Sequence, residues 1–208
     1  MNKENCIYCD MHRSDSSGTH YPWKRILLTQ VPALVEVYKS SGVNLYTTLQ
    51  RFPNKEHEDN EIEYCNLGFD FDSSADVSIA HEEAKRCVDY FTSNYSLGVS
   101  PEELMIYFSG NRGFHVTINA EVFEAEPQVD MVKIWRLLVN HLNKEWKFRT
   151  LDLAVYTRRR SWRIPNTIHT KTGLYKTPLT YDQLNTSLDN IRELAKKPAD
   201  WIDLVEVL

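Results

Sequence analysis

The chain has 208 residues, of which 42% are hydrophobic and 25% charged, and its formal net charge is −5. These values are typical of a globular domain that buries its own core, and the acidic balance argues against indiscriminate nucleic-acid binding by overall charge. No apolar run approaches the roughly 20 residues that cross a bilayer. The first 15 residues contain no apolar signal segment. We therefore expect a cytoplasmic protein with no membrane partner.

The four cysteines, at positions 6, 9, 65 and 87, do not resemble a disulfide framework. Cys6 and Cys9, with His12 and His20 downstream, offer the sulfur and imidazole ligands of a structural Zn²⁺ site. The loose histidine spacing and the polar surroundings favour a floppy terminus instead. Both alternatives stay open, and the other two cysteines are expected in the core.

Apolar spacing predicts the helices and strands. Residues 1–25 are expected to be irregular, and helices are predicted over four segments, 31–40, 80–95, 131–146 and 187–196. Strands are predicted over six segments, 44–52, 62–72, 104–108, 114–118, 151–156 and 174–178. We divide the chain into an N-terminal irregular segment with a helix, residues 1–43, and a core, residues 44–208. This order predicts a mixed α/β or α+β domain whose strands carry the polar motifs.

Two aspartates, Asp70 and Asp72, alternate with Phe69 and Phe71 in one predicted strand. Residues two apart in a strand point to the same face and lie roughly 6.6 Å apart. Both carboxylates therefore project together, while the phenylalanines face the core. Carboxylates on one strand suit the Mg²⁺ or Mn²⁺ ions of a two-ion phosphoryl-transfer site. Aspartates that merely cap a following helix give the same pattern, so this motif decides nothing alone.

The segment Ser109–His115 joins two predicted strands and contains two glycines. Glycine allows a backbone amide to approach an anion closely, and the Arg112 guanidinium suits phosphate. Ser109 adds a hydroxyl donor and His115 an imidazole. A simple hairpin turn explains the glycines but not the other three residues. The segment therefore predicts a phosphate-binding loop.

Residues 149–176 hold seven Arg and Lys residues and a single carboxylate, Asp152. Such a concentration is expected of a groove that meets phosphates, and a solvated basic loop is the alternative. Asp152 offers a third metal carboxylate. The stretch that begins at Arg163 adds His169 and Lys171 as phosphate contacts.

In order, Leu67–Asp72, Ser109–His115 and Leu151–Gly173 resemble the three motifs of the archaeo-eukaryotic primase superfamily, the primase-polymerases. The family patterns are hhhDhD, where h is hydrophobic, SGxRGxH, and an hD strand leading to a basic stretch that ends in xxHxKTG. The likeness covers about residues 44–180. It implies an α+β catalytic core, in which an αβ module and a module like an RNA-recognition motif enclose the active site in a cleft.

The resemblance also implies a role for each motif residue. The residues that bind catalytic Mg²⁺ or Mn²⁺ are Asp70, Asp72 and Asp152. The residues that hold the incoming nucleoside triphosphate are Ser109, Arg112, His115, Arg163, His169 and Lys171. The implied activity is template-dependent synthesis or extension of primers on single-stranded DNA by two-ion catalysis. A helicase or an accessory primase domain is an open partner.

Other functions remain open at this stage. A gap-filling repair polymerase would extend primers but could not start them. A metal-dependent nuclease would have no use for residues that contact a triphosphate. A non-catalytic nucleic-acid-binding module would have no use for three clustered carboxylates. Among the aromatic residues, Trp162, Tyr156 and Tyr175 can stack on template bases, although at least two of them are expected in the core. The sequence leaves open the sugar preference, the biological pathway, the oligomeric state and whether the chain is part of a longer protein.

Overall fold

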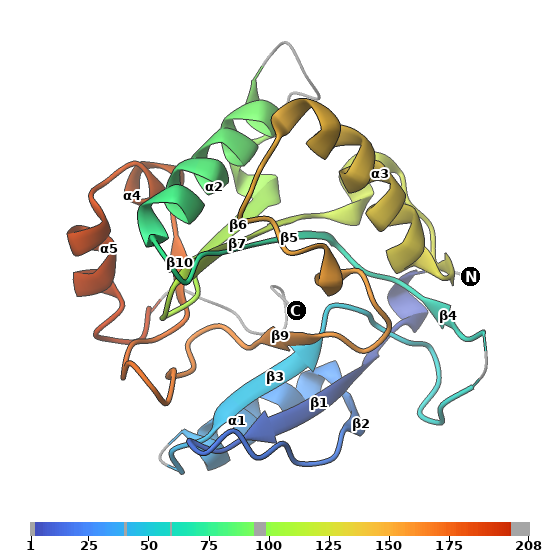
Figure 1. The fold of residues 1–208 in the computed structure, drawn as a ribbon. Coiled ribbons are helices and arrows are strands. Elements are labelled where there is room, and N and C mark those ends of the chain that lie inside the picture. The colour runs from blue at the N-terminus through green and yellow to red at the C-terminus, as the bar shows by residue number, and fades with distance from the viewer. Residues whose placement is uncertain (1–2, 40, 59, 94–98, 201–208) are drawn as a thin grey trace.

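The computed structural model describes residues 3–39, 41–58, 60–93 and 99–200. Their framework is a pair of four-stranded antiparallel sheets (Figure 1). The first has the order β2-β1-β3-β9, with β1 (Tyr8–Ser14), β2 (Lys24–Leu27), β3 (Asn44–Thr48) and β9 (Ser161–Arg163). The second has the order β10-β6-β7-β5, with β5 (Leu67–Asp72), β6 (Leu104–Phe108), β7 (Gly113–Ile118) and β10 (Thr177–Leu179). Packed with helices, these antiparallel sheets make an α+β fold.

The first sheet packs one face against helix α1 (Val31–Tyr38). The buried residues of this cluster are Cys9, Met11, Leu28, Val31, Val35, Leu45 and Ile164. Pro32 lies in the first turn of α1, where a missing backbone N–H leaves no hydrogen bond unmade. Strand β1, from the predicted N-terminal segment, pairs with β3 from the predicted core.

The prediction of irregular structure over residues 1–25 is wrong at 8–14 and 24–25, which form β1 and the start of β2. Asp10, His12 and Ser14 are buried on one face of β1 although all three are polar. Each is accommodated by a partner inside the fold, such as the Ser161 hydroxyl, 2.7 Å from Nε2 of His12. Cys9 and Met11 alternate with these polar residues, but the segment is short and rich in polar and charged residues, so its composition resembles that of a loop.

The second sheet packs one face against helices α2 (Val77–Thr92) and α3 (Met131–Trp146), which lie above it in Figure 1. Phe69 of β5 is fully buried, and its ring centroid lies 5.6 Å from that of Phe91 in α2 and 5.9 Å from that of Trp146 in α3. These contacts hold β5 rigidly, because close-packed aromatic rings leave no room for the strand to shift. The strand predicted over 104–108 and the helix predicted over 131–146 are confirmed.

Several other predicted boundaries are corrected by tertiary pairing. The strand predicted over 62–72 divides into β5 and β4 (Ile62–Glu63), which pairs with β8 (Gln128–Val129). The strand predicted over 174–178 is β10, and the terminal helix is α5 (Leu188–Leu194), preceded by α4 (Tyr181–Leu184). The predicted ends of two helices, at residues 40 and 95, lie outside the described residues. The short 3₁₀ helices are η1 (Lys3–Asn5), η2 (Leu28–Gln30), η3 (Pro101–Glu103), η4 (Ala120–Phe123) and η5 (Leu153–Val155).

The zinc alternative does not fit the structure. Cys6 is buried in the cluster beneath the second sheet, whereas Cys9 is buried in the cluster of the first sheet. His12 stacks on Tyr46, with ring centroids 4.7 Å apart. Over the described ranges, no group of three or more His, Cys, Asp or Glu side chains is placed to hold a metal ion. The other two cysteines lie in the core, as predicted.

None of the helices in the described part of the chain combines the length and the apolar character needed to cross a membrane.

Candidate active site

Strand β5 carries the first pair of candidate metal ligands. The phenylalanines that alternate with Asp70 and Asp72 are fully buried, whereas the aspartates are partly exposed on the opposite face. In the register with β7, Asp70 lies opposite His115 and Asp72 opposite Gly113. The first two motifs are therefore adjacent on paired strands, as their presumed cooperation requires.

Asp152 joins this pair through backbone hydrogen bonds. The Asp72 N–H donates to the Thr150 carbonyl and the Asp152 N–H donates to the Asp70 carbonyl, both at 2.8 Å. The segment thus lies along the free edge of β5 for a few residues. The prediction of a strand over residues 151–156 is wrong for the residues that follow these two hydrogen bonds. Asp152 instead begins η5, because its side chain accepts a hydrogen bond from the Ala154 N–H at 2.8 Å.

A buried carboxylate on α2, Glu83, holds that segment in place. It accepts hydrogen bonds from the Arg149 and Thr150 N–H groups, both at 2.9 Å, and from the Thr150 hydroxyl at 2.6 Å. Glu83 therefore fixes the backbone just before Asp152, and with it the position of Asp152. Sequence reasoning missed Glu83, and the only signal for it was a carboxylate on the apolar side of a helix.

The three aspartates crowd negative charge into one place. Burial, together with the charges of Asp72 and Asp152, raises the pKa of Asp70 from its ordinary value to about 7. Two arginines offset part of this charge. Arg112 grips both oxygens of Asp72, with its shortest contacts at 2.7 Å, and Arg160 lies 3.2 Å from Asp152. These ion pairs occupy carboxylate oxygens that a metal ion would use.

The loop of the second motif packs on the third motif. Gly110 has φ +80°, and a Cβ there would lie 2.9 Å from the carbonyl oxygens of Leu174 and Tyr175, so no other residue fits. The Thr172 hydroxyl donates to the Gly110 carbonyl at 2.5 Å. Ser109 uses its hydroxyl within the loop, where it accepts from the Gly113 N–H at 3.2 Å. The loop geometry therefore depends on residues about 60 positions away.

His115 is a buried imidazole with spare hydrogen-bonding capacity. Its Nε2 lies 3.5 Å from Oδ1 of Asp70, and its ring centroid lies 4.2 Å from that of Trp162. Its Nδ1 is buried and has no hydrogen-bond partner among the described residues. Burial, with nearby Lys176 and Arg163, holds the pKa of His115 well below its ordinary value. The ring is thus neutral, and its Nδ1 is left without a hydrogen bond among the described residues.

Arg163, on β9, is a buried guanidinium held by neutral groups. It donates to the Asn44 side-chain carbonyl at 2.9 Å and to the Tyr46 hydroxyl at 3.4 Å. No carboxylate of the described residues forms an ion pair with it. Burial lowers the pKa of Arg163. A buried cation without a counter-charge attracts an anionic ligand.

The remaining predicted phosphate contacts surround His169. Burial and the charges of Arg163, Lys171 and Arg112 lower the pKa of His169 to about 4. Each of these three charges therefore acts on the imidazole, and each belongs to a residue predicted to contact the triphosphate. The Lys171 N–H donates to Nδ1 of His169 at 3.2 Å, and the lysine side chain is exposed.

A second site residue missed by sequence reasoning is Lys176. Its side chain is fully buried, its amine donates to the Arg163 carbonyl at 2.8 Å, and the amine lies 4.4 Å from the centre of the Tyr107 ring. Burial and Arg163 hold the pKa of Lys176 well below its ordinary value, while Asp70 acts in the opposite sense. The basic segment contained this lysine, but nothing in its spacing distinguished it from exposed neighbours.

Three consecutive arginines of the basic segment are not free for phosphate. Arg158 and Arg159 lie 3.8 and 3.9 Å from the Glu61 carboxylate, and Arg159 also lies 3.5 Å from Asp10. Arg160 pairs with Asp152, as described above. The charge of this segment is therefore partly neutralised by acids from distant parts of the chain, which its local composition does not reveal.

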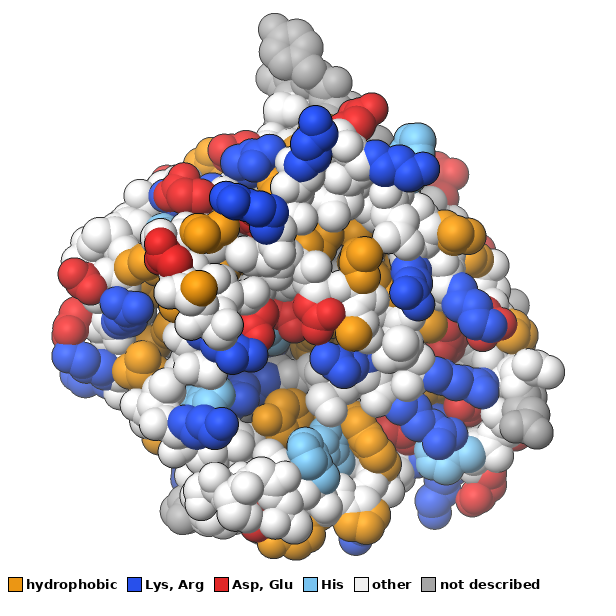
Figure 2. Space-filling view, viewed as in Figure 1, with side chains coloured by type: hydrophobic (Ala, Val, Ile, Leu, Met, Phe, Trp, Pro, Cys, Tyr) orange, Lys and Arg blue, Asp and Glu red, His pale blue; other side chains and the backbone are white. Residues whose placement is uncertain are grey.

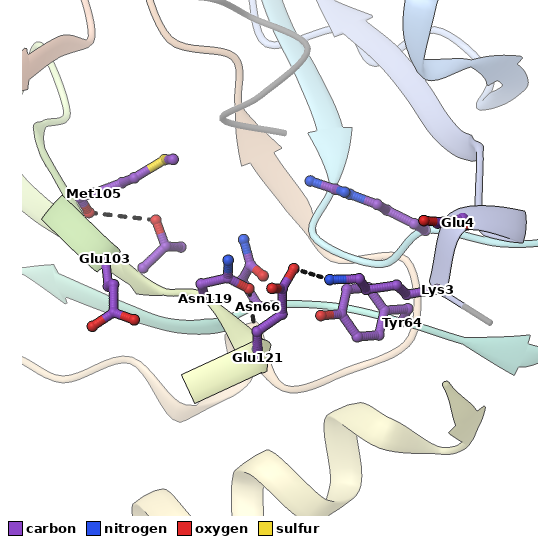
Figure 3. A pocket seen from close by; sticks show the side chains of 10 residues that line it. Lys3, Glu4, Tyr64, Asn66, Glu103, Met105, Asn119 and Glu121 are labelled. Atoms are coloured by element: carbon purple, nitrogen blue, oxygen red, sulfur yellow. Dashed lines mark hydrogen bonds and ion pairs between the residues drawn. The ribbon is translucent and has the colours of Figure 1, made fainter. Parts of the chain in front are cut away.

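Charged side chains of both signs gather near the centre of the face that Figure 2 draws. Figure 2 shows acidic side chains near the centre of this face, with Lys and Arg side chains beside them. A separate cavity of about 260 Å³ opens near η1 (Figure 3), and its lining includes Lys3, Tyr64, Thr117 and Asn119. None of its lining residues belongs to the three motifs. This cavity is therefore separate from the three motifs, which make up the candidate active site.

The aromatic residues proposed for base stacking are mostly buried. Trp162 and Tyr156 are each 3% exposed, as expected for core residues. The Tyr156 hydroxyl donates to the Gly68 carbonyl at 2.5 Å. Tyr175 is half-buried. Trp162 and Tyr156 therefore belong to the core, and an aromatic surface for bases has to be sought elsewhere.

Comparisons of the whole fold identify its class. The polymerase domain of Mycobacterium tuberculosis ligase D, solved in complex with DNA, matches with a TM-score of 0.53 and 13% identity, over 97% of this chain and 86% of that chain. The primase-polymerase domain of cyanophage S-2L matches with a TM-score of 0.53 and 15% identity, over 91% and 90%. This chain has the fold of the archaeo-eukaryotic primases.

Other comparisons add little. The primase RepB′ gives a TM-score of 0.45 and 10% identity, over 90% of this chain and 57% of that chain. No family model matches the sequence, and neither does any curated protein. At such low identities the likeness establishes the primase fold alone. The chemistry must be argued from this chain's own residues.

Proposed function

We propose that this protein is a metal-dependent, template-directed nucleotidyltransferase that synthesises or extends primers on single-stranded DNA. One observation carries the proposal: three carboxylates tied to β5 lie near two buried cations, Arg163 and Lys176, that form no ion pair with a carboxylate of the described residues. The first set suits divalent metal ions and the second suits a triphosphate. The primase fold supports this interpretation, and the two-module division with an intervening cleft belongs to the same proposal, as does the boundary between residues 1–43 and 44–208.

The chemistry of the donor set suits the proposed Mg²⁺ or Mn²⁺ ions, although within the described residues the three carboxylates, two of them paired with arginines, are not arranged around one metal position. Asp70, Asp72 and Asp152 supply only oxygen ligands, which hard cations prefer. The pKa of Asp70 is raised by burial and by the charges of Asp72 and Asp152, and a bound cation would neutralise that negative charge. When bound, such ions stabilise phosphate charge and acidify an attacking 3′-hydroxyl. We therefore assign all three aspartates as metal ligands.

The ion pairs suggest how the charged groups rearrange. Arg112 now pairs with Asp72, and its side chain is half-exposed. Among the described residues, Asp70 also attracts this guanidinium, but at longer range. The side chain can therefore turn away from Asp72 when another cation takes its place. Metal binding to Asp72 would release this guanidinium toward the triphosphate. Arg160 stands in the same relation to Asp152. Arginines would thus neutralise the carboxylates before substrate arrives and neutralise phosphate afterwards.

The basic groups near the carboxylates would bind and orient the triphosphate. Arg163, which is buried, and Lys171, which is exposed, bring positive charge, and His115 adds a neutral imidazole. His169 and Ser109 complete the proposed set. No side chain needs to act as a nucleophile, since in-line attack by the primer hydroxyl on the α-phosphate requires only positioning and electrostatic stabilisation.

A synthesis assay tests this function. The protein is incubated with labelled nucleotides and Mn²⁺ or Mg²⁺ on unprimed and on primed single-stranded DNA. We expect products that Asp72→Ala does not form although it folds, because the variant lacks a metal ligand. Products only on primed DNA would identify a polymerase that needs a partner to initiate. Loss of strand without use of nucleotide would identify a nuclease, and DNA binding without either reaction would reduce the protein to a binding module.

A further inference from the structure

A row of residues crosses the first sheet and ends at the proposed triphosphate site. His12 on β1 lies opposite Tyr46 on β3, and Tyr46 lies opposite Arg163 on β9. Residues directly opposite one another across strands point to the same face of a sheet. Their contacts agree with this register, because Arg163 donates to the Tyr46 hydroxyl at 3.4 Å and His12 stacks on the Tyr46 ring.

The row continues into rings that reach solvent. The centroid of His12 lies 3.9 Å from that of Trp23 and 5.4 Å from that of His20. His12 itself is 5% exposed, whereas Trp23 is half-buried and His20 exposed. The outer rings are thus braced from below by His12 on Tyr46. We call Trp23, His20, His12 and Tyr46 the aromatic row.

His12, at the centre of the aromatic row, is neutral at physiological pH. Burial and the neighbouring His20 lower the pKa of His12 to about 4, so its imidazole carries no charge. Its Nε2 lies 2.7 Å from the Ser161 hydroxyl, which fixes the ring plane. Flat, fixed and uncharged rings are suited to stacking on bases, whereas the neighbouring charged groups suit phosphates.

We propose that the aromatic row binds successive bases of the single-stranded template. This inference rests on the proposed function and names where the template lies. The row runs from Tyr46 to His12, with ring centroids 4.7 Å apart, and from His12 to His20, with centroids 5.4 Å apart, so it offers more rings than the one base of an incoming nucleotide can use. Figure 2 agrees, since histidine and hydrophobic side chains gather over β1 and β3 on the same face as the central charged groups.

Variants of the exposed rings test the proposal. We expect Trp23→Ala to weaken binding of a labelled oligothymidylate about five- to a hundredfold, the range for losing one base–aromatic stack, with a smaller loss for His20→Ala. Trp23→Phe keeps a ring and should restore most of the affinity. Tyr181→Ala removes an exposed aromatic ring from α4, outside the row, and should change nothing. Fluorescence anisotropy at fixed salt concentration gives each affinity.

An abasic strand separates stacking from phosphate contacts. Wild-type protein should bind the abasic strand more weakly than oligothymidylate, and this difference should shrink for Trp23→Ala. Equal losses on both strands would overturn the proposal, as would unchanged oligothymidylate binding. A rise in nucleotide KM without loss of template affinity would overturn it in favour of the incoming base. If Asp72→Ala and wild type alike synthesise nothing while the abasic difference persists, the proposed function fails and the stacking surface stands.

Discussion

Asp70 is the residue at which burial and charge conflict most strongly. Its carboxylate lies next to two others and, with 22% of the side chain exposed, has little water to stabilise it. A protein does not keep such an arrangement for stability, since each ionised neighbour makes folding less favourable. The conflict is understandable if a cation is part of the working site.

This conflict predicts a pH effect on stability in the absence of divalent metal. Because the folded-state pKa of Asp70, about 7, exceeds the ordinary value of 3.8, the folded state binds its proton more tightly. The contribution of Asp70 is thus fully present below pH 3.8 and is lost as pH rises through 7. We expect Asp70→Asn to raise the melting temperature at pH 8 in EDTA and to change it little at pH 4.

Circular dichroism melts at several pH values measure this difference. Adding Mg²⁺ at pH 8 should raise the melting temperature of the wild type more than that of Asp70→Asn. Parallel pH profiles for the two proteins would show that Asp70 titrates normally, and the proposed charge crowding would then be wrong.

At the scale of elements, two motifs are positioned by segments far away in the sequence. Helix α2 positions the third motif, and the loop at residues 174 and 175 packs against the second. Glu83 accepts three hydrogen bonds from the segment before Asp152. Gly110 lets the second motif lie against residues 174 and 175. Neither residue touches the proposed substrate site through its own functional group, so both act by positioning others.

Glu83→Gln tests the positioning of Asp152. The amide replaces one acceptor oxygen with a donor that faces backbone N–H groups, so we expect the segment to shift. Mn²⁺ affinity should fall about 10- to 100-fold, as for other residues that orient metal ligands. Titration by electron paramagnetic resonance measures this affinity. Glu82→Gln, an exposed neighbour paired with Lys85, is the matched control and should bind Mn²⁺ normally.

Gly110→Ala tests the packing of the two loops. Besides the positive φ, the added Cβ would meet carbonyl oxygens at 2.9 Å, and backbone cannot easily move aside. Gly42→Ala shares a positive φ of 66° but has no atom within 4 Å, so it measures the cost of the backbone conformation alone. We expect urea unfolding to show a larger loss for Gly110→Ala than for Gly42→Ala. Equal losses would mean that the loops separate freely.

For the molecule as a whole, a buried ion network joins the first sheet to the basic segment. Arg25 on β2 pairs with Asp10 on β1 and with Glu61, both at 2.8 Å, and all three side chains are at most 3% exposed. The same two acids also attract Arg158 and Arg159. The network thereby positions the arginines that precede β9, next to the proposed active site.

Replacing Arg25 should weaken the whole fold. Arg25→Met leaves two buried carboxylates without their main partner, and breaking a buried pair in this way costs roughly 3–5 kcal/mol. The exposed pair of Lys39 and Glu36 is the control, since Lys39→Met should cost at most about 0.5 kcal/mol. Urea unfolding at pH 7 compares the two variants. Similar small losses would show that the remaining arginines replace Arg25 as partners.

The sequence by itself determined which functional groups the candidate site contains and their order along the chain. The alternation of Asp70 and Asp72 with two phenylalanines placed both carboxylates on one face, because strand geometry has a period of two residues and needs no knowledge of the rest. The sequence alone also predicted the loop of the second motif, from its glycines and charged groups, and the helices with strong apolar periodicity.

Only the tertiary structure decided how these groups meet. Asp152 reaches β5 through contacts across about 80 residues, and Glu83 and Lys176 support the site from positions that no local pattern marks. Strand β1 escaped prediction because its buried polar residues find their partners on other strands. Spacing encodes which face a side chain occupies, whereas pairing, burial and the resulting pKa values depend on neighbours that only the folded chain supplies.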